Sequence, residues 1–182
     1  MTDFSDLVQR RRSHRKYQPS EVCADDVRLI LRAALMSPTS KNARAWHFVV
    51  VDDGVKLQQL ADAKDMGARF LEKAAFAVVV CANPLETDCW VEDCSVAAIS
   101  MQYQAEELGV GSCWAQMRGR GLPDGTAATQ VVRGIVGLPD DMEVLCVVGF
   151  GLKAEERKLQ NEDKLKWENV HLNQFDTSNV KQ

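Results

Sequence analysis

The sequence predicts an α+β protein in which helices cover both faces of one β-sheet. Three runs rich in β-branched residues, "WHFVVVDD", "AFAVVVCAN" and "MEVLCVVGFG", are typical of buried strands. Stretches with helical periodicity lie between them, but the connections do not follow a regular βαβ repeat. A chain of 182 residues can bury a sizeable core, so one domain is expected.

Three helices are expected from local patterns. Residues 4–12 predict a short helix with Phe4, Leu7 and Val8 on one face. Residues 24–37 predict a longer helix that ends before Pro38, because proline disfavours α geometry in the preceding residue. Its apolar face consists of Val27, Ile30, Leu31, Ala34 and Leu35. Residues 126–137 predict a third helix with a glycine stop.

The longest helix is expected over residues 88–109. Apolar residues recur there at intervals of three and four and form a heptad-like stripe of Val91, Cys94, Ala98, Met101, Ala105 and Leu108. Two interpretations are open. The stripe packs within the core of its own subunit, or the helix also packs against its copy in a dimer.

The last two expected elements are a strand and an arm. "GVGSCWAQ", residues 109–116, is typical of a strand that enters a loop. The tail is charged apart from Leu159, Leu165, Trp167, Val170, Leu172 and Phe175. Apolar side chains at such uneven spacing favour an extended arm over one amphipathic helix. We therefore expect a domain over 1–151 and an arm over 152–182 that wraps a partner subunit.

The segment "RRRSHRKY", residues 10–17, is strongly basic in a chain whose formal net charge is −4. Nucleic acid, a membrane surface and the phosphate of a small molecule are its possible partners, and a solvated charged face is the simplest alternative. The acidic balance argues against a protein whose whole surface binds a polyanion. Guanidinium groups beside the Ser13 hydroxyl offer the forked donors that a phosphate prefers.

Other features narrow the class of protein. No apolar run approaches the ~20 residues of a membrane span, and the N-terminus lacks a signal-peptide core, so a cytoplasmic protein is expected. The six cysteines form no CxxC pair and the three histidines lie far apart, so we expect reduced thiols and no metal site.

Two further segments carry binding chemistry. "SPTSKNARAW", residues 37–46, groups the short polar side chains of Thr39, Ser40 and Asn42 before a strand. In "GVGSCWAQMRGR", glycines allow close backbone approach and Trp114 offers an aromatic surface. This segment is not the GxGxxG fingerprint, and the Walker A pattern is absent.

Taken together, in this order and over nearly the whole chain, these segments resemble the nitroreductase family of FMN-dependent oxidoreductases. The resemblance implies a three-layer fold with a central mixed, mainly antiparallel sheet flanked by helices. It also implies an intertwined homodimer with FMN at the subunit interface. One departure is Arg44-Ala45 before Trp46, where many members have Gln-Pro. Arg44 adds a cation near the expected rim of the site.

The resemblance also implies the residues that contact FMN. Arg11, Arg12 and Ser13 would hold the phosphate and ribityl chain, and Arg15 the N1/O2 edge. The other implied contacts are Pro38, Thr39, Ser40 and Asn42 from the second subunit, Trp114, Ala115 and Gln116 beside the flavin, and Lys158 or Arg157 at the phosphate.

The implied activity is a ping-pong transfer of hydride from NADH or NADPH, through flavin N5, to an acceptor such as a nitroaromatic or a quinone. No side chain is assigned a catalytic role, since the chemistry occurs on the flavin. Cys113 has no adjacent base that would make it a nucleophile. Two alternatives are a non-reductase use of the fold, such as flavin storage, flavin breakdown or dehalogenation, and a nucleic-acid-binding module.

Overall fold

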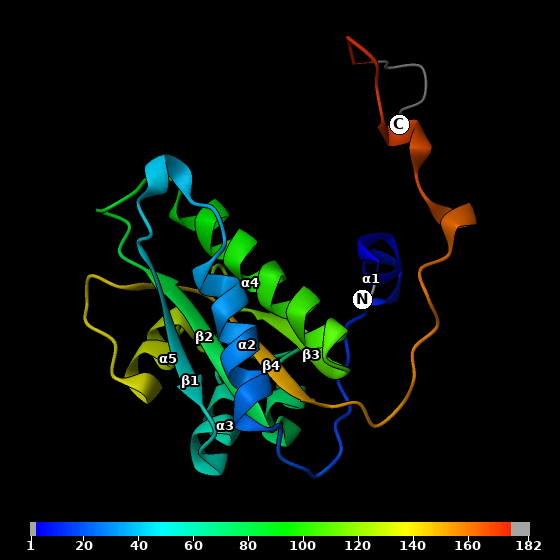
Figure 1. The fold of residues 1–182 in the computed structure, drawn as a ribbon. Coiled ribbons are helices and arrows are strands. Elements are labelled where there is room, and N and C mark those ends of the chain that lie inside the picture. Colours follow the sequence, from blue (N-terminus) through cyan, green and yellow to red (C-terminus); the bar gives the residue numbers. More distant parts are fainter. Residues whose placement is uncertain (1–2, 176–182) are drawn as a thin grey trace.

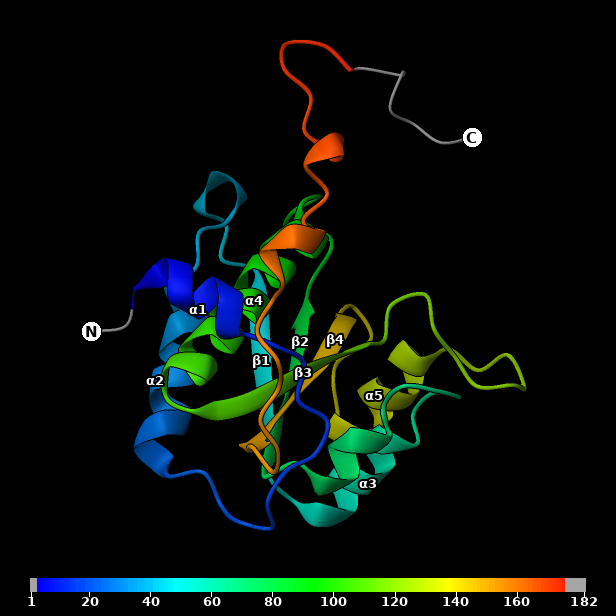
Figure 2. The ribbon, with the colours of Figure 1, turned by 90° about the vertical axis from the view of Figure 1, so that its right-hand side faces the viewer.

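The computed structural model describes residues 3–175 and shows three layers, with the sheet between two sets of helices (Figures 1 and 2). The sheet order is β1-β2-β4-β3, with β1 at Trp46–Val51, β2 at Phe76–Ala82, β4 at Glu143–Leu152 and β3 at Val110–Gln116. One face carries α2 (Ala24–Leu35) and α4 (Trp90–Glu107), and the other carries α3 (Gly54–Ala61) and α5 (Ala128–Val136). The predicted α+β class is confirmed.

The sheet is antiparallel at each of its three strand pairs, unlike the mixed sheet that the resemblance implied. Within residues 3–175, parallel pairing occurs only at an isolated bridge between Ser13 and Ser112. That bridge joins Ser13, which belongs to no named strand, to Ser112 of the edge strand β3.

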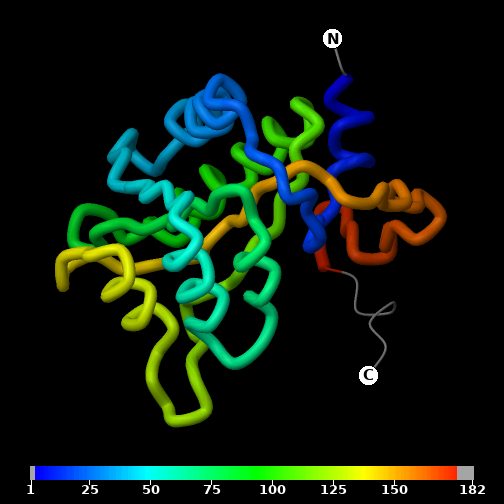
Figure 3. The backbone as a smooth tube through the Cα atoms, turned by 90° about the horizontal axis from the view of Figure 1, so that it is seen from below, coloured from blue at the N-terminus to red at the C-terminus, as the bar shows by residue number. Residues whose placement is uncertain are grey.

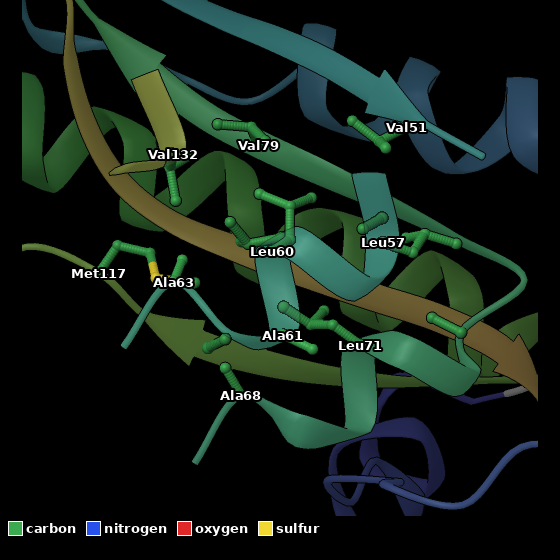
Figure 4. Close-up of a cluster of buried hydrophobic side chains, with 14 of the residues drawn as sticks. Val51, Leu57, Leu60, Ala61, Ala63, Ala68, Leu71, Val79, Met117 and Val132 are labelled. Carbon is green, nitrogen blue, oxygen red and sulfur yellow. The ribbon is translucent and has the colours of Figure 1, made fainter. Parts of the chain in front are cut away.

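Two apolar clusters, one on each face of the sheet, form the core. Leu57 and Leu60 of α3, with Val132 of α5, pack on Val79 of β2 (Figure 4). Ile30 of α2 and the inner side of α4 pack on the opposite face. Every residue of β2 is buried because this central strand is covered on both sides, which explains its continuous apolar run.

The stripe on α4 faces the core of its own chain. Cys94, Ala98, Met101 and Ala105 are all 0% exposed, and they pack in the same cluster as α2 and the sheet. The first interpretation is confirmed, and these four side chains are not available to a second copy of the helix. Val96, on the outer side of α4, is 37% exposed.

Several boundaries differ from the expected ones. The first helix, α1 (Phe4–Arg10), stops two residues early because the chain there becomes extended toward β3. The expected helix over 88–109 spans only α4. The helix expected over 126–137 is α5, which begins at Ala128 and ends at Val136, capped by Gly137, whose φ of 70° suits glycine. Helix α3 and a 3-10 turn, η2 (Arg69–Lys73), were not predicted.

After β4 the chain first runs back along residues 9–16 and α1, where the Ala154 amide donates to the Lys16 carbonyl at 3.2 Å and the Gln160 amide to the Gln9 carbonyl at 3.0 Å, and it then extends away from the body of the molecule (Figures 1 and 3). Up to residue 175 this segment contains only two short 3-10 turns, η3 (Glu162–Lys164) and η4 (Trp167–Asn169). Its apolar side chains are exposed, with Trp167 at 70% and Leu172 at 85%. Residues 176–182 of the expected arm lie outside the described part of the chain.

None of the helices described over residues 3–175 combines the length and the apolar character that crossing a membrane requires.

Candidate functional site

The basic segment is joined to the end of the sheet by backbone hydrogen bonds. The His14 amide donates to the Ser112 carbonyl of β3 at 2.9 Å, and the Gln18 amide donates to the Leu152 carbonyl of β4 at 2.9 Å. Between them, Tyr17 forms an antiparallel bridge with Lys153. The segment therefore has a defined conformation, which a loose solvated loop would lack.

Tyr17 is the apolar anchor of this segment. Its ring is 9% exposed, and its hydroxyl donates to the Gly149 carbonyl at 3.1 Å. Burial raises the pKa of this hydroxyl, so it stays a donor. A Cβ atom at Gly151 would lie 2.8 Å from the Tyr17 Cγ, so the ring requires glycine there.

Three cations surround Cys113 on β3. Burial raises the pKa of the Cys113 thiol, while Arg15, a hydrogen bond with Ser13, Arg11 and Lys64 act in the opposite direction. Arg11, Ser13 and Arg15 therefore lie near Cys113 on β3. The thiol is 1% exposed and its pKa is raised, which argues against a reactive nucleophile.

Lys64 and Arg120 extend this positive cluster. The Lys64 ammonium donates to the Gln116 carbonyl at 2.9 Å. Burial and, next, repulsion by Arg120 lower the Lys64 pKa. Within residues 3–175, Arg11, Arg15, Lys64 and Arg120 form no ion pair with a carboxylate. Their uncompensated charge makes this surface suited to an anion. We call these four residues the basic cluster.

Two side-chain hydrogen bonds fix Gln116 at the end of β3. The Gln116 side-chain amide donates to the Arg118 carbonyl, and its Oε1 accepts from the Trp114 indole, both at 2.9 Å. Ala115 is buried in the cluster under α3 and α5, whereas Trp114 packs on the α4 side. The Gln116 backbone carbonyl thus contacts Lys64 of the basic cluster, whereas the Gln116 side chain lies with the Trp114 ring on the face of the strand opposite Cys113 and Ala115.

Arg12 and Lys158 occupy a neighbouring position. The Arg12 guanidinium donates to the backbone carbonyls of Lys158 and Leu159. Arg157, the alternative to Lys158, lies 3.6 Å from the Glu155 carboxylate. In this chain Arg12 therefore holds the start of the arm, and its side chain is already engaged by protein atoms.

The polar loop of residues 38–42 lies elsewhere. The Ser40 amide donates to the Asp93 carboxylate in the first turn of α4, at 2.8 Å. Helix α1, which leads into the basic segment, instead contacts Tyr103, with 5.7 Å between the Phe4 and Tyr103 ring centroids. Asp93 and Tyr103 are about 15 Å apart along the helix at about 1.5 Å per residue.

One chain therefore brings together only part of the predicted site. Arg11, Ser13, Arg15 and Gln116 converge at β3, whereas the loop with Pro38, Thr39, Ser40 and Asn42 is held near the other end of α4. Lys64 was not predicted, because a lysine after a short helix forms no recognisable motif. Only the tertiary fold brings it to β3.

Comparisons with known proteins agree on one family. The family model described as "Nitroreductase family" matches residues 8–88. A relative from Archaeoglobus fulgidus, named as a candidate NADH dehydrogenase/NAD(P)H nitroreductase, is 31% identical over 94% of this chain and 98% of its own length.

Two solved structures show the same fold over almost their whole length. An FMN-dependent nitroreductase from Clostridium difficile R20291 has a TM-score of 0.91 and 40% identity, covering 93% of this chain and 98% of that one. A candidate NADH dehydrogenase/NAD(P)H nitroreductase from Bacteroides thetaiotaomicron VPI-5482 has a TM-score of 0.85 and 32% identity, covering 94% and 97%.

Proposed function

The chain belongs to the nitroreductase family, and on that premise we propose that it is an FMN-dependent oxidoreductase. It would carry hydride from NADH or NADPH to an acceptor such as a nitroaromatic or a quinone, in a ping-pong sequence. The observation that carries the proposal is the basic cluster: Arg11, Arg15 and Lys64 lie near Cys113 and Ser13 at β3, Arg120 lies near Lys64, and none of the four pairs with a carboxylate within residues 3–175.

The donors of this surface fit FMN. Arg11 and Ser13 offer a guanidinium and a hydroxyl to a phosphate dianion, and the backbone of Lys158, which would add an ammonium as a third donor, contacts the neighbouring Arg12. Arg12 contributes indirectly, by holding the backbone of Lys158 in place. This assignment accounts for the strongest charge feature of the sequence without requiring nucleic acid.

The rest of the cluster suits the redox end of the cofactor. When bound, FMN supplies hydride chemistry at N5, where it takes a hydride from NAD(P)H and gives it to the acceptor. Arg15, with Lys64 beside it, would stabilise the negative charge that reduction places at the N1/O2 edge. Gln116, fixed by Trp114 and the Arg118 carbonyl, would orient the ring. No side chain needs to act as a general acid or base.

We propose that the functional unit is a homodimer in which Pro38, Thr39, Ser40 and Asn42 reach the partner's flavin. The support is the distance within one chain, since their loop is fixed to the Asp93 end of α4 and the basic segment lies near the Tyr103 end. Three residues of this loop region, Lys41, Asn42 and Arg44, have positive φ, which is uncommon outside glycine and favours a functional role for the loop.

The phosphate assignment predicts that Arg11→Ala weakens FMN binding by about tenfold or more, because a hydrogen bond to a charged group contributes about 1.5–3 kcal/mol. Ser13→Ala should weaken it in the same direction. Fluorescence titration of the apoprotein measures both. Arg28→Ala, an exposed arginine on α2, is the matched control and should bind like the wild type. Wild-type affinity in both site variants would refute the placement.

The arm assignment predicts that removal of residues 161–182 raises the dimer dissociation constant and weakens FMN binding together. This truncation keeps the contacts of Arg12 with Lys158 and Leu159, and that of Gln9 with Gln160. It removes the exposed Trp167, whose burial on a partner would contribute about 2–3 kcal/mol. Sedimentation combined with flavin fluorescence tests this, and a truncated protein that stays a tight yellow dimer contradicts it.

A visible spectrum and an anaerobic mixing experiment test the function itself. The purified protein should absorb as a flavoprotein, and NADH or NADPH should bleach that absorbance in the absence of oxygen. A yellow protein that neither nucleotide bleaches favours flavin storage, flavin breakdown or dehalogenation. A colourless protein whose binding to DNA or RNA falls steeply with salt would instead be a nucleic-acid-binding module.

A further inference from the structure

A small cavity of about 240 Å³ lies behind the basic segment, on the side of His14. It is bounded by the end of α1, the end of α4 and the chain that follows β4. The charged groups that face His14 there are Arg10, Glu106, Glu107, Lys153, Glu156 and Arg157. The function proposed above uses none of these side chains.

The His14 side chain is buried beside this cavity. It is only 3% exposed, and its Nδ1 atom is buried without a hydrogen-bond partner among the described residues. This position of His14 requires glycine at residue 111, because a Cβ atom at Gly111 would lie 2.9 Å from the His14 Cβ and 3.2 Å from its Cγ. The ring is therefore packed against the β3 backbone, next to the bridge between Ser13 and Ser112.

The cavity is electrically balanced only while His14 is neutral. Beside the ring, the Lys153 ammonium lies 2.7 Å from the Glu106 carboxylate, with the two side chains 13% and 6% exposed. Arg10, Lys153 and Arg157 match the three carboxylates of Glu106, Glu107 and Glu156 in number. A proton on the imidazole would add an uncompensated positive charge beside Lys153.

Ser13 and Arg15, the sequence neighbours of His14, lie beside Cys113 and not in the cavity. Ser13 and Arg15 interact with Cys113 of β3, beside the basic cluster. Since one short extended stretch carries both sets, a displacement of the His14 backbone also displaces Ser13 and Arg15. The cavity and the cofactor-binding face are thus mechanically linked.

We propose that His14 is a positioning residue for FMN: its neutral imidazole, seated on Gly111 beside the Glu106–Lys153 pair, holds Ser13 and Arg15 in their binding arrangement. Protonation of the ring loosens the segment and weakens FMN binding. This inference rests on the proposed function, because FMN is its ligand.

The direction of the pH effect follows from the burial. Desolvation, followed by Lys153, lowers the His14 pKa from 6.5, and Glu106 only partly opposes this. A histidine whose pKa is depressed in the seated state takes up a proton when the segment opens below its ordinary pKa of 6.5. Acid therefore favours the open segment, and affinity should fall as the pH drops below that value.

The test is the pH dependence of the FMN dissociation constant of the dimeric apoprotein at about pH 7.5 and about pH 5.5. The FMN phosphate itself titrates with a pKa of about 6, but it does so equally in every variant. His14→Gln cannot titrate, so on acidification to pH 5.5, one unit below the ordinary His14 pKa of 6.5, the wild type should lose up to about tenfold more affinity than the variant. His47→Gln, at an exposed position on β1, should follow the wild type.

An identical pH dependence in wild type and His14→Gln would overturn the inference, as would a wild-type affinity that rises on acidification relative to His14→Gln. If His14→Gln fails to fold, NMR titration of the wild type decides instead. The His14 pKa should be lower with FMN bound than in the apoprotein, and equal values exclude positioning. A wild type that binds no FMN at pH 7.5 refutes the proposed function first.

Discussion

Replacing Ala98 with Glu should destabilise the protein severely and leave little folded material. Ala98 is 0% exposed in the cluster between α4, α2 and the sheet. A larger side chain there overpacks the core, which costs about 1–3 kcal/mol, and an unpaired buried carboxylate costs several kcal/mol more. At roughly 2–4 °C per kcal/mol for a chain of this size, thermal unfolding followed by circular dichroism should shift by on the order of 10 °C or more.

Val96→Glu is the matched control, on the same helix but on its outer side, where Val96 is 37% exposed. We expect a change in unfolding free energy within about 0.5 kcal/mol, as for ordinary surface substitutions. A well-folded Ala98→Glu protein with wild-type unfolding temperature would mean that the α4 stripe does not face its own core.

Removing the Glu106 carboxylate should cost about 3–5 kcal/mol, because it leaves the Lys153 ammonium buried without its partner. Glu106→Leu should therefore lower the unfolding temperature by on the order of 10 °C. The double variant Glu106→Leu/Lys153→Met should recover much of this loss, since well-packed apolar side chains often replace a buried ion pair without penalty.

The exposed pair between Lys16 and Glu155 provides the contrast. Its Nζ and Oε2 atoms are also close, at 2.8 Å, but the side chains are 71% and 38% exposed. Lys16→Met should change the unfolding free energy by no more than about 1 kcal/mol. If Lys16→Met and Glu106→Leu lower the unfolding free energy equally, burial of the Glu106–Lys153 pair does not raise the cost of breaking it.

The sequence determines the elements whose signals are local. The β-branched runs at β1, β2 and β4, the stop of α2 before Pro38 and that of α5 at Gly137 follow from the stereochemistry of a few adjacent residues. The short α3 was not predicted: Leu57, Leu60 and Ala61 have the i, i+3, i+4 spacing of a helix, but eight residues show this pattern only once and begin with a glycine. Packing of Leu57 and Leu60 on the sheet stabilises it.

The sequence also predicts part of the candidate site. The basic residues around Ser13 are contiguous, so their charge is visible without a fold. Their number, however, does not show which way each side chain points. The structure divides them, with Arg11 and Arg15 facing β3 and Arg12 holding the arm.

The rest was decided only by the tertiary structure. A stripe such as that of Ala98 and Met101 shows that one side of a helix is apolar, but not whether its own sheet or a second copy covers it. Likewise, nothing adjacent to Lys64 or His14 in the sequence indicates that one joins the basic cluster and the other is buried behind it. Periodicity and composition report on neighbours along the chain, whereas burial and charge balance depend on residues that only the fold brings together.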